Sequence, residues 1–146
     1  MRNTLYDRDF YAWANQQAQL LRAGNLADAD IDLIAEEIES MGKAEKRELV
    51  SRLAILTMHL LKWLHQPSGR STSWRLTIEE QRRKTVRHLA DNPSLKYRLD
   101  EALDDAYGDA ILSAARETGL DRSDFPSACP WSYEHIVDPN FWPEQE

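Results

Sequence analysis

Five leucines recur every three or four residues between positions 49 and 64, and they constrain the fold of this chain more than any other feature. This spacing places their side chains on one face of an α-helix. Further apolar residues widen that face until little polar surface remains in its second half, as is typical of a helix surrounded by others. We therefore expect a central helix at about 43–65, with these side chains buried: Leu49, Leu53, Leu56, Leu60 and Leu64.

The rest of the chain shows the same helical periodicity and no convincing strand alternation. Gly24, Gly42 and Gly119 each follow the last apolar position of a segment, and Pro67 cannot continue a helix, so we expect breaks at these four residues. The chain holds only five Gly, which disfavours a sandwich or barrel with many tight turns. The predicted fold class is all-α, a bundle of about five helices at about 7–23, 30–41, 43–65, 73–90 and 93–118.

The C-terminal segment 120–146 contains four Pro and is predicted to be mostly irregular, with one helical turn at 132–136. It is too apolar for a loose tail, so we expect it to wrap over the bundle or over a partner subunit. A chain of 146 residues suits one domain. We expect a single domain over 1–146, with the bundle at 7–119 and these aromatic residues docked: Phe125, Trp131, Tyr133, Phe141 and Trp142.

Cysteine content and hydropathy bear on the compartment. Cys129 is the single cysteine and cannot form an internal disulfide, and no charged-then-apolar leader follows Met1, so we expect a cytoplasmic protein. The most apolar segment, 53–64, is too short to span a bilayer, so no membrane insertion is expected. Nucleophilic catalysis has no support, because the chain has no Gly-x-Ser-x-Gly motif and Cys129 has no flanking base.

Charge is divided into three blocks. Residues 1–42 hold 3 basic and 8 acidic side chains, residues 43–92 hold 11 and 5, and residues 93–146 hold 4 and 12. Helices of opposite charge neutralise one another when they pack side by side. We therefore expect the basic segment 70–87 to pack on the acidic helix at 93–118, and an anion-binding patch is the alternative. The acidic residues concerned are Asp100, Glu101, Asp104, Asp105 and Asp109.

A carboxylate-bridged metal centre in a helical bundle needs Glu-x-x-His on two helices. The residues three positions before the four histidines (His59, His65, His88 and His135) are Leu56, Lys62, Thr85 and Ser132, so the motif is absent. One cysteine excludes a cysteine-rich zinc site. We expect no metal and no cofactor, and a metal held by residues from different helices is the alternative.

Several polar side chains are predicted to meet where the helices at 43–65 and 73–90 run antiparallel. Glu37 falls at the edge of its apolar face, so it needs a cationic partner, with Arg82 or Lys62 the candidates, whereas Glu36 should face solvent. A buried network that joins helices is the favoured interpretation. A small enzyme pocket around Glu37, His59 and Arg82 is an alternative. The full cluster is Glu37, His59, Lys62, Gln81 and Arg82.

The loop after Pro67 leads into a helix start, whose free N–H groups attract anions. Arg70, Ser73, Arg75 and Arg82 are the candidate anion-binding residues. The chain has no phosphate-loop or dinucleotide fingerprint, and its net charge of −7 would repel nucleic acid. Nucleic-acid binding is therefore disfavoured but stays an alternative for the 70–87 segment.

Six motifs occur in an order that resembles a known family: "YDRDFYAWANQQAQLLRAG", "EEIESMGKAEKRE", "HLLKW", "SWRLTIEEQRR", "NPSL" and "FPSACPW". Over residues 6–131 the chain is similar to the bacterial family known as domain of unknown function 29. The resemblance implies a compact, all-helical bacterial protein, and it implies no activity, ligand or catalytic residue.

Taken together, these features favour a non-enzymatic helical interaction module, with self-association as one form of that role. The first alternative is an anion or nucleic-acid binder that uses the basic 70–87 segment, and steep weakening with ionic strength would identify it. The second alternative is the small enzyme described above. A protein partner or a second copy of the chain is therefore the expected partner.

Overall fold

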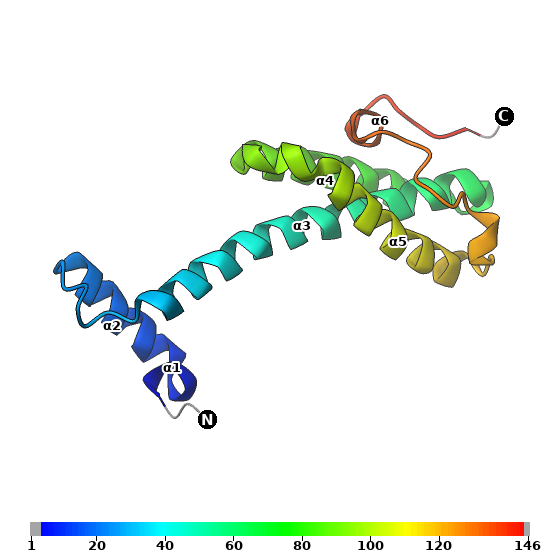
Figure 1. The fold of residues 1–146 in the computed structure, drawn as a ribbon. Helices are drawn as coiled ribbons and strands as arrows, with labels where there is room; N and C mark the ends of the chain where they lie inside the picture. Colours follow the sequence, from blue (N-terminus) through cyan, green and yellow to red (C-terminus); the bar gives the residue numbers. More distant parts are fainter. Residues whose placement is uncertain (1–3, 145–146) are drawn as a thin grey trace. The chain divides into compact units, whose positions relative to one another are not determined.

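The computed structural model describes residues 4–144, and in that range it contains only helices and the loops between them (Figure 1). The all-α fold class is therefore confirmed. The chain divides into two compact units, residues 1–43 and 44–146. That the two units form one domain stays a prediction. Within the described range, no helix combines the length and the apolar character needed to cross a bilayer.

The first unit contains α1 (Leu5–Arg8), α2 (Phe10–Arg22) and the beginning of α3 (Ile31–His65). The Asp9 side chain accepts a hydrogen bond from the Ala12 N–H at 3.0 Å, so a cap separates α1 from α2 where one helix was expected. Trp13 donates from Nε1 to Asp30 Oδ2 at 2.7 Å, and the buried Gln17 accepts from the Asp30 N–H at 2.7 Å. These bonds fix α2 against the start of α3.

Gly42 does not end a helix, so the predicted break between 30–41 and 43–65 was wrong. Helix α3 runs without interruption from Ile31 to His65. A glycine inside a helix costs about 1 kcal/mol relative to alanine, and good helix formers on both sides outweigh that cost. No turn is required at this position, because its φ angle is not positive.

The second unit is built around the remainder of α3, with α4 (Thr72–Asp91) and α5 (Leu99–Thr118) packed against it (Figure 1). The predicted central stripe forms the core, where it meets Ile78 of α4 and Ala102 and Ala106 of α5. Leu64 at the end of the stripe is only half-buried, which corrects one member of the prediction. The fully buried leucines, each 0% exposed, are Leu49, Leu53, Leu56 and Leu60.

The corner between α3 and α4 is a single 3-10 turn, η1 (Pro67–Gly69), as the proline predicted. Ser71 caps α4 by accepting from the Trp74 N–H at 3.2 Å. The ring of Trp74 closes over the turn, so that a Cβ built on Gly69 would lie 2.5 Å from the ring carbon Cη2.

The segment between α4 and α5 corrects the predicted start of α5. Pro93 opens a second 3-10 segment, η2 (Pro93–Arg98), so α5 begins at Leu99 and not in the turn that contains the proline. Gly119 ends α5 with a left-handed φ of 77°, as expected.

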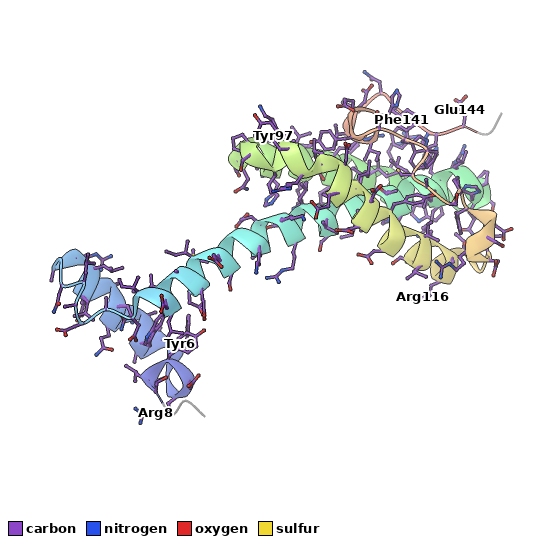
Figure 2. The ribbon with its side chains drawn as sticks, in the orientation of Figure 1. Tyr6, Arg8, Tyr97, Arg116, Phe141 and Glu144 are labelled. Atoms are coloured by element: carbon purple, nitrogen blue, oxygen red, sulfur yellow. The ribbon has the colours of Figure 1, made fainter. Side chains whose placement is uncertain are left out.

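The C-terminal wrap contains η3 (Arg122–Asp124) and α6 (Tyr133–Val137), which lies against α4 in Figure 1. Phe125 is 5% exposed and Ile136 is 0% exposed. The ring centroid of Trp142 lies 4.6 Å from that of Trp63 on α3. Figure 2 shows Phe141 in the extended segment that follows α6. The prediction that the C-terminal aromatic residues are docked is confirmed within the second unit.

Candidate functional site

Glu37 is half-buried and Glu36 is exposed, as predicted from the helix phase. The partner of Glu37 is the Tyr6 hydroxyl, which donates a short hydrogen bond to Oε1 within the first unit. This bond, more than any other contact, raises the pKa of Tyr6 above its ordinary value. Glu37 therefore has a hydrogen-bond partner inside the first unit, and its ion pair with Arg82 or Lys62 of the second unit stays a prediction.

His59 and Lys62 are both on α3 in the second unit. His59 donates from Nδ1 to the Ile55 carbonyl at 2.9 Å, and burial lowers the pKa of its imidazole. Lys62 is 7% exposed, and its ammonium lies 3.4 Å from Glu117 Oε2 and 4.5 Å from the ring centre of Trp74. The lysine is therefore held by an ion pair and a cation–π contact, and its partner carboxylate comes from α5.

Arg82 is 3% exposed and faces the C-terminal wrap. It donates from Nε to the Ile136 carbonyl at 2.8 Å and from Nη2 to the Phe141 carbonyl. Its guanidinium carbon lies 5.2 Å from the Trp142 ring centre. Gln81 beside it has a buried Oε1 without a hydrogen-bond partner among the described residues.

The three ionisable members of the predicted cluster in the second unit are not joined to one another. His59, Lys62 and Arg82 each take a different partner there, and within residues 44–144 no hydrogen bond or ion pair connects any two of them.

The predicted anion-binding residues are also separated. Arg70 donates from Nε to the Trp63 carbonyl at 2.8 Å and lies over the Trp63 ring at 4.9 Å, so its guanidinium serves the corner. Ser73 is exposed inside the first turn of α4, where Ser71 is the capping residue. Arg75 is exposed, and none of the ion pairs in the described range includes it. Arg82 is engaged by the wrap, as described above.

The expected packing of basic α4 on acidic α5 is corrected by the ion pairs. Cations of α3 meet α5 instead: Lys46 Nζ lies 2.6 Å from Glu101 Oε1, and Lys62 pairs with Glu117. The outer side of α4 keeps Arg83 and Arg87 exposed. Together with Arg82, Val137 and Pro139 they line a groove of about 640 Å³ between α4 and the wrap.

A surface that the sequence analysis did not single out lies in the first unit. Seven of the thirteen exposed large hydrophobic side chains in residues 4–144 belong to it, although it is the smaller unit. Ile31, Ile38 and Met41 of α3 are 49%, 63% and 68% exposed. They recur at helical spacing, and periodicity alone does not tell which molecule covers such a face. We call these three residues the α3 apolar face.

A second group that was missed lies between α3 and α4. Glu45, Glu48 and His88 bring potential ligand atoms within 4.8 Å of one another. Glu48 also accepts from Arg52 Nη2 at 2.6 Å, a bond that lowers the pKa of this carboxyl. The Glu-x-x-His motif does not describe this group, because the two carboxylates come from α3 and the imidazole comes from α4. The usable signal was a Glu pair three apart on one helix, facing a histidine on the antiparallel neighbour.

Comparison with known proteins gives one result. A family model described as Domain of unknown function DUF29 matches residues 5–142, which is nearly the whole chain. The chain therefore belongs to this family. No curated protein and no solved structure matches it.

Proposed function

We propose that this member of the DUF29 family is a helical interaction module that binds a second copy of itself through the α3 apolar face. The observation that supports the proposal is the exposure of Ile31, Ile38 and Met41 on one side of a regular helix. Contiguous exposed apolar surface marks interaction sites in soluble proteins. Spacings of three, four and three residues from Ile31 through Ile34 to Met41 match those of helices that pack on partner helices.

The charged residues that alternate with the α3 apolar face lie on the other side of the helix. Asp32, Glu36 and Glu39 follow one another at four and three residues, and with about 3.6 residues per turn they point away from Ile34 and Ile38. Lys43 continues that outer side four residues later. The apolar face carries none of these charges, so an identical face on a second copy can cover it without burying them. A two-fold dimer suits such a face, because the same patch is then buried on both copies: residue i of one copy contacts residue j of the other, and the reverse also holds.

The oligomeric state tests the proposal directly. We expect the full chain to have the mass of a dimer in light scattering after size exclusion, and Ile38→Glu to reduce it to the monomer, because a charge is then buried in the contact. The matched control is Leu112→Glu, which places the same charge at an exposed apolar site of α5 that is 48% exposed. It should leave the mass unchanged. Circular dichroism should show that both variants keep their helical content.

A second pair of variants tests which side of α3 makes the contact. Met41→Glu should weaken the dimer as Ile38→Glu does, because Met41 is 68% exposed on the same face. Glu36→Lys changes the charge of an exposed side chain on the opposite side of the helix and should leave the mass unchanged. A monomeric parent chain would contradict self-association. A dimer that persists in both Ile38→Glu and Met41→Glu would contradict the α3 apolar face as the contact.

The second candidate function is anion binding along α4, and the groove beside Arg83 and Arg87 supports it. An exposed guanidinium group can donate two parallel hydrogen bonds to the oxygens of one phosphate. Binding of a single-stranded oligonucleotide that weakens steeply with salt, and that is lost in Arg83→Ala/Arg87→Ala, would favour this function over self-association.

A further inference from the structure

The imidazole of His88 is the starting point, because its two nitrogens have different surroundings. The side chain lies on α4 and the residue is only 8% exposed. Nε2 lies 2.7 Å from the main-chain oxygen of Glu45 on α3. A carbonyl oxygen only accepts, so Nε2 carries the hydrogen and donates it. In the neutral ring the lone pair is therefore on Nδ1.

No hydrogen-bond donor reaches Nδ1 in the part of the chain that the structure describes. Oε2 of Glu48 lies 3.9 Å from Nδ1, which is too far for a hydrogen bond. The second carboxylate, that of Glu45, has its Oε2 3.6 Å from the protonated Nε2. A cation at the Nδ1 lone pair is therefore placed to contact Glu48, and the exposed Glu45 side chain reaches it by rotation about its own bonds.

The distances fit a shared metal ion. Ligand atoms about 2.0–2.2 Å from a tetrahedral zinc lie about 3.4 Å apart, so the separation of 3.9 Å between His88 Nδ1 and Glu48 Oε2 needs to shorten by only about 0.5 Å. The three side chains offer ligand atoms within 4.8 Å of one another, a gap that small rotations of exposed glutamates can close. An imidazole with carboxylates suits zinc and the neighbouring first-row metals, whereas calcium and magnesium prefer oxygen alone.

The surrounding contacts hold the ligands as metal sites require. The bond from His88 Nε2 to the Glu45 carbonyl fixes the ring and its tautomer, as outer contacts of ligating histidines commonly do. Arg52 engages Oε1 of Glu48, which leaves Oε2 free toward the histidine. Asn92 Nδ2 lies 3.4 Å from Glu45 Oε2 and orients the second carboxylate.

Access and charge are also compatible with an ion. The three side chains line a surface cavity of about 550 Å³ between α3 and α4, so an ion and its water ligands can enter. Three cations share the lining with Asp91: Arg52, Lys84 and Arg87. Arg52 is paired with Glu48 and Lys84 with Glu80, so two of the three positive charges are already compensated.

We propose that Glu45, Glu48 and His88 form a binding site for a divalent transition-metal ion of the zinc class. The site lies entirely within the second unit, so it does not depend on the proposed self-association. It replaces the earlier expectation that the chain binds no metal.

Binding of Co²⁺ and Zn²⁺ to the full chain tests the site. Co²⁺ should produce the visible absorption of nitrogen and oxygen ligation, and Zn²⁺ added in excess should displace it. Glu48→Gln and Glu45→Gln should each weaken binding at least about tenfold, as the loss of a metal-site contact does. Both glutamates are exposed, so these variants should fold. His88→Ala should abolish the absorption, and circular dichroism should confirm that it is folded.

The matched control is Glu101→Gln, an exposed glutamate that also pairs with a base of α3 but lies outside the cluster. It should bind both metals as the parent does. Absence of Co²⁺ absorption and of any heat of Zn²⁺ binding in the parent chain would overturn the site. Equal binding in Glu45→Gln, Glu48→Gln and the parent would overturn it as well, since the ion would then be held elsewhere.

Discussion

The guanidinium of Arg82 donates from Nε to the main-chain carbonyl of Ile136 at 2.8 Å, across 54 residues of sequence. A second nitrogen of the same group donates to the Phe141 carbonyl, and the ring of Trp142 lies 5.2 Å from the guanidinium carbon. One side chain of α4 therefore satisfies two carbonyls of the C-terminal wrap. The segment after α6 has little regular structure of its own, so these bonds account for its fixed course.

Arg82→Ala should destabilise the protein by about 3 kcal/mol or more, because a hydrogen bond from a charged donor contributes about 1.5–3 kcal/mol and two carbonyls lose their donor. Urea unfolding measures the change. Arg83→Ala is the control, since Arg83 is exposed on the next position and should change stability by less than about 0.5 kcal/mol. Arg82→Lys should recover little, because an ammonium does not reproduce the planar fork. A variant Arg82→Ala as stable as Arg83→Ala would show that the wrap is held by packing alone.

Deletion of residues 125–146 should lower the melting temperature and expose surface that binds an apolar dye. The deletion removes Phe125 and Ile136, which are 5% and 0% exposed, and it uncovers the α4 and α5 side chains beneath them. Differential scanning calorimetry and dye fluorescence measure both effects. An unchanged melting temperature would mean that the segment serves a partner and contributes nothing to the bundle.

Leu60→Ala should cost about 2–5 kcal/mol, as is usual for a leucine at the centre of a core. The side chain is 0% exposed and packs in the main hydrophobic cluster of the second unit. Leu64→Ala on the same helix should cost clearly less, because Leu64 is only half-buried. Chemical denaturation of the two variants provides the comparison, and a reversed order would contradict the core as described.

Stability should fall as the pH is lowered from about 7 to about 5, because two histidines resist protonation in the folded state. Burial lowers the pKa of His59 and of His65 from the ordinary value of 6.5. Above 6.5 both rings are neutral whether the chain is folded or not, so they contribute no pH dependence there. Below 6.5 the unfolded chain takes up protons that the folded chain takes up only at lower pH, and stability is lost through that window.

The double variant His59→Gln/His65→Leu isolates this effect, and its melting temperature should change less over the same range. Hydrogen bonds from lysines lower the pKa values of Glu80 and Glu101 below the ordinary value of 4.5. These two carboxyls therefore affect stability only below pH 4.5, and they should do so equally in the parent and in the double variant. The ordinary histidine pKa of about 6.5 lies between pH 7 and pH 5. If the parent and the double variant lose stability equally over this range, His59 and His65 do not cause the loss.

Helix positions could be predicted where one local cause dominates. The leucine stripe, Pro67 and Gly119 each act through steric or hydrophobic effects that neighbours do not reverse. The helix breaks at Pro67 and Gly119 are confirmed, and so is the burial of four of the five leucines. The predicted break at Gly42 was wrong, because the helix-breaking effect of one glycine is small enough for adjacent residues to overcome. Pro93 was expected in the first turn of the fifth helix, but it opens a 3-10 segment of six residues that precedes α5.

The partners of polar side chains could not be predicted in the same way. Glu37 was expected to need a cation, and the phenol of Tyr6 from α1 is a partner that the sequence did not indicate. Lys62 was a candidate partner of Glu37, and the carboxylate 3.4 Å from it belongs to Glu117 of α5. The sequence offers several possible partners for each charged side chain. Which partner is close enough to bind depends on how the helices are aligned along their axes, and the sequence does not give that alignment. The same limit hid the Glu45, Glu48 and His88 group.

Position 69 and position 74 can change only together. A methyl group on Gly69 would overlap the Trp74 ring at 2.5 Å, so Gly69→Ala must displace an indole that also lies over the Lys62 ammonium. A smaller residue at 74 would remove the overlap, so Trp74→Leu should suppress the damage caused by Gly69→Ala. The two substitutions should therefore be non-additive by about 1 kcal/mol or more in a double-mutant cycle. In this tight turn, a tryptophan at position 74 therefore requires that position 69, five residues earlier, has no side chain.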